Sequence, residues 1–92
     1  MRNIHYIKIW EEFVIPILNE EKTFEIREND RGYNRGDLVV FKAIDKNGNN
    51  SKLFEVTELN KNIYEITYVL SDFHVDRNYV VFSFRKCIKW GI

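Results

Sequence analysis

The sequence predicts a β-rich α+β domain, a small pseudo-barrel of about six mixed or antiparallel strands with one or two short helices. Three observations support this fold class: six short segments rich in β-branched and aromatic residues, one early segment with helical spacing, and turn residues between most of them. The chain has 92 residues, of which 45% are hydrophobic and 15% aromatic. We therefore expect residues 1–92 to form a single domain with a modest core.

The first predicted strand covers residues 4–10, where apolar and mixed positions alternate. This alternation places Lys8 and Trp10 on one face and His5 on the other. Trp10 is a candidate either to stack on a base or to form the wall of a cleft. His5 is more typical of a structural histidine than of a ligand or a base.

Helical spacing of apolar residues over residues 11–21 predicts the first helix. Pro16 lacks a backbone N–H, so we expect the regular helix to begin near Glu12 or Phe13 and to keep Pro16 in its first turn. A second strand is expected over residues 23–27, followed by a loop rich in turn formers.

The remaining four strands are expected at residues 38–44, 53–59, 63–70 and 79–84. Asn47-Gly48 is the expected centre of a hairpin turn between the first two of them. Residues 71–78 form a polar loop, and a short tail ends the chain at residues 90–92.

The most informative segment concentrates charged and amide side chains of both signs on one strand and the loop that follows it: Lys22-Thr23-Phe24-Glu25-Ile26-Arg27-Glu28-Asn29-Asp30-Arg31. A structural strand needs only the apolar half of such a pattern. Alternation predicts that Phe24 and Ile26 face the core, while the polar side chains face a site for a small polar ligand.

Two readings of the polar residues remain open. In the first, Lys22 and Arg27 donate to a phosphate, carboxylate or carbonyl, and Glu25 accepts from an amino group or acts as a general base. In the second, Glu25 forms an ordinary surface ion pair worth about 0.5 kcal/mol. In the loop, Asp30 is expected to cap the strand, and Asn29 or Arg31 to face the ligand.

Composition excludes several classes of function. The 14 basic and 14 acidic side chains balance, which argues against a broad footprint on duplex DNA or on a membrane surface. A single cysteine, Cys87, excludes an intrachain disulfide and a cysteine-cluster zinc site. No metal motif or cofactor-binding loop is recognisable, so neither a metal nor a cofactor is expected. With no apolar run near the ~20 residues of a membrane span and no signal-like segment, a cytoplasmic location is expected.

The order of these motifs resembles that of a known family. It comprises His5-x-x-Lys8-Ile9-Trp10, a short helix, the segment from Lys22 to Arg31, and Gly36-Asp37-x-Val39. This arrangement resembles the ASCH-like branch of the PUA superfamily, and is closest to a small bacterial and phage family of unknown function. The resemblance implies a pseudo-barrel with a ligand cleft between the helix end and the barrel mouth. It also implies RNA binding or recognition of modified nucleosides.

Some small members of that superfamily are amidohydrolases that remove the acyl group of acetylated cytidine with a lysine, a threonine and a glutamate. Lys22 matches the position of the lysine, but Glu25 stands where the threonine would be, and the glutamate has no equivalent here. This departure shifts the expectation from catalysis toward binding.

We therefore expect a domain that binds RNA or a small nucleoside-like ligand through a mixed-charge cleft, whose residues are Lys8, Trp10, Lys22, Glu25, Arg27, Asn29 and Arg31. One alternative is an amidohydrolase in which Lys22 and Glu25 are catalytic. Another is a protein-interaction module, which would expose a broad apolar patch instead of a polar cleft.

Overall fold

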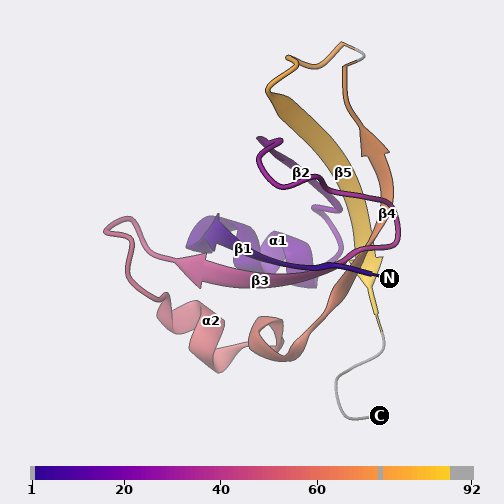
Figure 1. Cartoon of the computed structure of the whole chain (residues 1–92). Helices are drawn as coiled ribbons and strands as arrows, with labels where there is room; N and C mark the ends of the chain where they lie inside the picture. The colour runs from indigo at the N-terminus through magenta and orange to yellow at the C-terminus, as the bar shows by residue number, and fades with distance from the viewer. Residues whose placement is uncertain (1, 73, 88–92) are drawn as a thin grey trace.

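The computed structural model describes residues 2–72 and 74–87, which fold into a curled half-barrel of five strands with two short helices (Figure 1). The elements in chain order are β1 (Ile4–Trp10), the 3-10 turn η1 (Glu11–Phe13), α1 (Val14–Leu18), β2 (Phe24–Glu28), β3 (Leu38–Ile44), α2 (Lys52–Val56), the 3-10 turn η2 (Glu58–Lys61), β4 (Tyr64–Leu70) and β5 (Tyr79–Lys86). The fold is the β-rich α+β class that the sequence predicts.

The strands form one mixed sheet in the order β1-β3-β4-β5-β2. β1 and β3 run parallel over their full length, whereas the other neighbouring strands are antiparallel. β3 and β4 share only the pairs Leu38↔Glu65 and Val39↔Tyr64. The sheet therefore bends at this joint, so that β1 and β3 cross the direction of β4, β5 and β2 (Figure 1). The two ends of the sheet, β1 and β2, are both edge strands.

The concave side of the sheet holds the core, which consists of buried side chains from every strand except β2, from α1, from η2 and from Tyr33 in the loop before β3. Phe41, Tyr64 and Phe84 form an aromatic cluster with ring centroids 5.0–5.3 Å apart. On β1, His5 is buried while Lys8 and Trp10 are exposed, which confirms the predicted alternation.

Helix α1 begins slightly later than the sequence predicts. Glu11–Phe13 form a 3-10 turn, and the α-helix starts at Val14. Pro16 is the third residue of α1 and lies in its first turn, as expected, because the N–H groups of that turn have no partner within the helix.

The predicted strand at residues 53–59 is wrong: this segment forms α2 and η2. Leu53, Val56 and Leu59 recur every third residue, which is closer to a helical period than to alternation. Ser51 caps α2, because its hydroxyl accepts a hydrogen bond from the Leu53 N–H at 3.2 Å. The half-barrel therefore has five strands. The turn at Gly48 (φ 83°) closes on a single antiparallel bridge, Ile44↔Asn50, and then leads into a helix instead of a second paired strand.

The predicted orientation of β2 is also wrong. Phe24 and Ile26 are exposed, whereas Glu25 is buried. The reason is register: Glu25 pairs with Phe82 of β5, whose side chain lies in the core, and directly paired residues project from the same face of a sheet. Glu25 and Arg27 therefore point toward the concave side.

Within the described residues, no helix is long and apolar enough to cross a membrane. The predicted tail at residues 90–92 lies outside the described residues.

Candidate functional site

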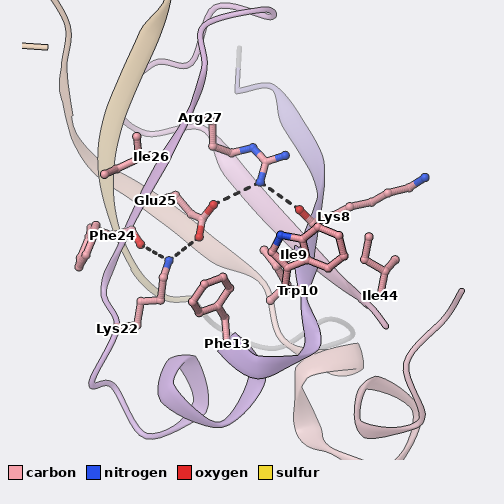
Figure 2. A pocket seen from close by; sticks show the side chains of 10 residues that line it. All are labelled: Lys8, Ile9, Trp10, Phe13, Lys22, Phe24, Glu25, Ile26, Arg27 and Ile44. Carbon is pink, nitrogen blue, oxygen red and sulfur yellow. Dashed lines mark hydrogen bonds and ion pairs between the residues drawn. The ribbon is translucent and has the colours of Figure 1, made fainter. Parts of the chain in front are cut away.

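A cleft of about 500 Å³ lies between the C-terminal end of β1 and the edge of β2 (Figure 2). We call it the β1–β2 cleft. Its lining residues come from β1, η1, β2, the end of β3 and the segment before β2: Lys8, Ile9, Trp10, Phe13, Lys22, Phe24, Glu25, Ile26, Arg27 and Ile44. Five of the seven predicted site residues therefore line one cavity.

The Glu25 carboxylate is the centre of the polar part of this cleft. It is only 6% exposed, and two cations hold it from opposite sides. Lys22 Nζ donates to Oε1, and Arg27 Nη1 donates to Oε2 at 3.2 Å. Figure 2 shows the carboxylate between the two cationic groups, which satisfies the requirement that a buried charge be paired.

Lys22 is fixed by contacts beyond Glu25. Its ammonium donates to the Phe24 carbonyl at 2.7 Å and lies 4.9 Å from the ring centroid of Phe13 and 5.1 Å from that of Phe24. The chain reaches this position through Glu20, whose φ of 60° reverses the backbone at the end of α1. All these neighbours stabilise a positive charge, so Lys22 is arranged as a hydrogen-bond donor.

Arginine side chains bridge the two edge strands. Arg27 Nη1 donates to the carbonyl oxygen of Lys8 at 3.0 Å, and Arg31 Nη1 donates to that of Tyr6 at 3.1 Å. Within the described residues, β1 pairs with β3 and β2 with β5, and these side-chain bonds take the place of backbone pairing between β1 and β2.

The polar groups of the cleft keep unused hydrogen-bonding capacity. Each Glu25 oxygen accepts from one cation and retains a further lone pair. Lys22 uses two of its three donors, on Glu25 and on the Phe24 carbonyl. Arg27 bonds through Nη1, which leaves its Nε and Nη2 groups for other acceptors. The site can therefore offer donors and an acceptor side by side.

Aromatic rings border this polar centre. Trp10 is 50% exposed and Phe24 is 46% exposed, and both line the cleft together with Phe13. Exposed rings beside hydrogen-bonding groups suit a flat ligand that stacks on one face and bonds along its edge.

Asn29 and Arg31 lie outside the β1–β2 cleft. Asn29 lines a separate surface hollow with Arg77 and Tyr79, and its backbone N–H donates to the Asn78 carbonyl at 2.8 Å. Arg31 contributes indirectly, through its bond to the edge of β1.

The start of β1 is anchored by a buried pair of side chains, His5 and Asp37. The sequence predicts His5 as a structural histidine but does not identify Asp37 as its partner. His5 Nε2 donates to Asp37 Oδ2 at 2.8 Å, and the same carboxylate accepts from the backbone N–H groups of Asn3 at 3.3 Å and Asn34 at 3.1 Å. Burial alone would raise the pKa of Asp37, but these hydrogen bonds and the charge of His5 outweigh it and lower the pKa. The pair fixes β1 against the loop that precedes β3.

Tyr33 fills the space between His5 and the core, with its ring centroid 4.7 Å from that of His5 and 5.1 Å from that of Phe82. Burial raises the pKa of Tyr33, and the positive charges of Arg31 and Arg27 oppose that rise. Its ring supports the concave side of the half-barrel near the bridging arginines.

Several cleft residues were not predicted as site residues. The alternation predicts Phe24 and Ile26 in the core. Phe13 and Ile44 are predicted only as members of the first helix and of the strand at residues 38–44. The position of Phe13 over Lys22 depends on how α1 packs, so local spacing carried no signal for it.

A second surface feature is the outer face of β2, β5 and β4. Phe24, Ile26, Tyr68 and Tyr79 are exposed there, and register places Phe24 and Tyr68 on either side of Ser83. This is the kind of apolar surface that the protein-interaction alternative requires. The molecule thus carries both a polar cleft and an exposed apolar face.

Among the residues that the structure describes, no group of three or more His, Cys, Asp or Glu side chains is placed to hold a metal ion. The chain matches no curated protein. Residues 4–84 match the family model described as "Domain of unknown function (DUF3850)", a span that runs from the start of β1 into β5 and includes every residue of the β1–β2 cleft. The chain therefore belongs to the DUF3850 family.

Proposed function

We propose that the β1–β2 cleft binds an unpaired nucleobase, presented either by RNA or by a free, modified nucleoside. The observation that carries this proposal is the convergence of Lys22, Glu25 and Arg27 on one aromatic-lined cavity. A purely structural ion-pair network would have no need of an adjoining cavity with exposed rings. We also propose that the fold belongs to the ASCH-like branch of the PUA superfamily, a placement supported by the curled half-barrel and the order of motifs.

The chemistry of the cleft matches the edge of a base. Glu25 can accept from an exocyclic amino group or a ring N–H, while Arg27 and Lys22 can donate to a neighbouring carbonyl or ring nitrogen. Trp10 or Phe24 can stack on the flat face of the same base, an interaction worth about 1–3 kcal/mol. Every class of group that a single unpaired base needs is therefore present within one cavity.

Replacing Arg27 by alanine is expected to weaken binding of a short single-stranded RNA by about 10- to 100-fold, because a charge-assisted hydrogen bond worth roughly 1.5–3 kcal/mol is lost. Fluorescence anisotropy with a pool of labelled ten-nucleotide RNAs of mixed sequence measures this affinity, and competition with ribonucleosides extends the measurement to free ligands.

Arg35→Ala is the matched control, because Arg35 is exposed and lies outside the β1–β2 cleft. Circular dichroism establishes that both variants remain folded. If folded Arg27→Ala binds a ligand of the wild-type protein with unchanged affinity, the cleft is not the binding site.

A second candidate function is amide hydrolysis on an acylated cytidine. The direct contact between Lys22 and Glu25 favours it, because Lys22 matches the position of the family's catalytic lysine and the carboxylate beside it could act as the base, although Glu25 stands where the family has its threonine. In this reaction Glu25 would accept a proton from water, the water oxygen would add to the acyl carbon, and the C–N bond would break as Glu25 returns that proton to the departing nitrogen. Free carboxylic acid and the amino form of the base would then leave.

If the protein is an amidohydrolase of this kind, it is expected to release acetate from N4-acetylcytidine. Acetate is measured over time with the wild-type protein and with Lys22→Ala. Equal, background-level release from both would exclude this substrate while leaving the binding proposal intact.

A further inference from the structure

The strands β1 and β3 lie side by side (Figure 1), and their parallel register places two lysines next to each other on the outer face. Lys8 pairs with Lys42 in the parallel register, and both side chains are exposed. Paired residues project from the same face, and neighbouring strands are about 4.8 Å apart. The two ammonium groups therefore extend from adjacent points of one surface.

This pairing is unfavourable without a partner, because like charges directly opposite each other destabilise a sheet. Within the described part of the chain, neither the Lys8 nor the Lys42 ammonium forms an ion pair or a hydrogen bond with another side chain. An anion held between them would remove the repulsion. The register alone thus makes this point of the sheet a place where negative charge is favoured.

The lysine pair is continuous with the cleft. Along β1, the outward-facing side chains are in turn Tyr6, Lys8 and Trp10, and Lys8 and Trp10 also line the β1–β2 cleft. Tyr6 is 66% exposed. Each of these side chains is about 6.6 Å from the next, so Tyr6 and Trp10 lie about 13 Å apart with Lys8 between them. Two aromatic rings with a cation between them suit two bases of an extended single strand and the phosphate backbone between those bases.

We infer that the ligand is a single-stranded nucleic acid chain, whose phosphodiester backbone lies over Lys8 and Lys42 while one of its bases occupies the β1–β2 cleft. This inference rests on the proposed base-binding function and extends it, because a free nucleoside carries no phosphate for Lys42 to meet. The balance of 14 basic and 14 acidic side chains fits a short contact with few phosphates.

The test compares the salt dependence of RNA binding in Lys42→Gln with that of the wild-type protein, using the same labelled ten-nucleotide RNA pool. For single strands, log K falls with log salt concentration with a slope of about −0.7 for each neutralised phosphate. Lys42→Gln is expected to make that slope shallower by about 0.7 and to weaken binding roughly 3- to 10-fold at low salt. Lys42→Arg, which keeps the charge, is expected to retain the wild-type slope.

Lys46→Gln is the control, since Lys46 is exposed in the turn after β3 and away from the paired strands. An unchanged slope and affinity in Lys42→Gln, with loss of binding in Arg27→Ala, would overturn the backbone contact and leave the base-binding cleft standing. The backbone contact would also be overturned if the wild-type protein bound a ribonucleoside as tightly as it binds the RNA. If the wild-type protein bound neither the RNA nor any ribonucleoside, both proposals would fall together.

Discussion

Replacing Asp37 by alanine is expected to lower the free energy of unfolding by about 3 kcal/mol, because it removes a buried carboxylate that accepts three hydrogen bonds. The carboxylate accepts hydrogen bonds from His5 at 2.8 Å and from the backbone N–H groups of Asn34 and Asn3 at 3.1 and 3.3 Å. Its removal leaves the buried His5 without its partner. Urea denaturation measures the loss, and Asp30→Ala, an exposed aspartate in the preceding loop, is expected to change stability by less than about 0.5 kcal/mol.

The same carboxylate gives the fold a defined pH dependence. Because folding lowers the pKa of Asp37, its contribution to stability is complete above about pH 4, near the pKa of an unfolded aspartate. The contribution is lost as the pH falls through the folded-state pKa. In Asp37→Asn, which cannot titrate, the free energy of unfolding should therefore fall less steeply below pH 4. Parallel acid-unfolding curves for the two proteins would contradict this role.

Replacing Glu25 by alanine is expected to cost about 2–4 kcal/mol, because Lys22 and Arg27 would then face each other across the cleft with no carboxylate between them. This range begins lower than the roughly 3–5 kcal/mol of a fully buried pair, since the side chains of Lys22 and Arg27 are 16% and 27% exposed. Urea denaturation is again the measurement. Glu25→Gln should cost less, since the amide oxygen can still accept one of the two hydrogen bonds.

Glu28→Ala is the control for this substitution. Glu28 lies on the same strand, is exposed and forms no ion pair within the described part of the chain. Its substitution should change stability by less than about 0.5 kcal/mol. Equal costs for the two glutamates would mean that the buried position of Glu25 contributes nothing to the fold.

Local patterns predicted most of the strands, because alternation and β-branched runs are properties of a few consecutive residues. β1 and β3 begin and end at the predicted residues, and the opposite orientation of His5 and Lys8 on β1 is as expected. The secondary structure of the segment after Gly48 is harder to predict, since its short apolar runs are compatible with a strand as well as with a helix. The hydroxyl of Ser51, which caps α2, decides between the two.

The orientation of β2 could not be predicted from its own residues. Alternation divides Phe24 and Ile26 from Glu25 and Arg27, but which set faces inward depends on the register with β5. Grouping of the cleft residues was partly predictable: Lys22, Glu25 and Arg27 are neighbours in sequence. Their approach to Lys8 and Trp10 depends on how the two ends of the sheet curl toward each other.

The arginine bridges between β1 and β2 have a consequence for association between molecules. An unpaired strand edge is a template on which a strand of another chain can add, and such addition leads to aggregation. On the exposed edge of β1, the carbonyl oxygens of Tyr6 and Lys8 are already occupied by the guanidinium groups of Arg31 and Arg27. An incoming strand would have to displace both charged groups and leave Glu25 with one cation fewer. The edge of β1 that borders the cleft is thereby protected against intermolecular β-pairing.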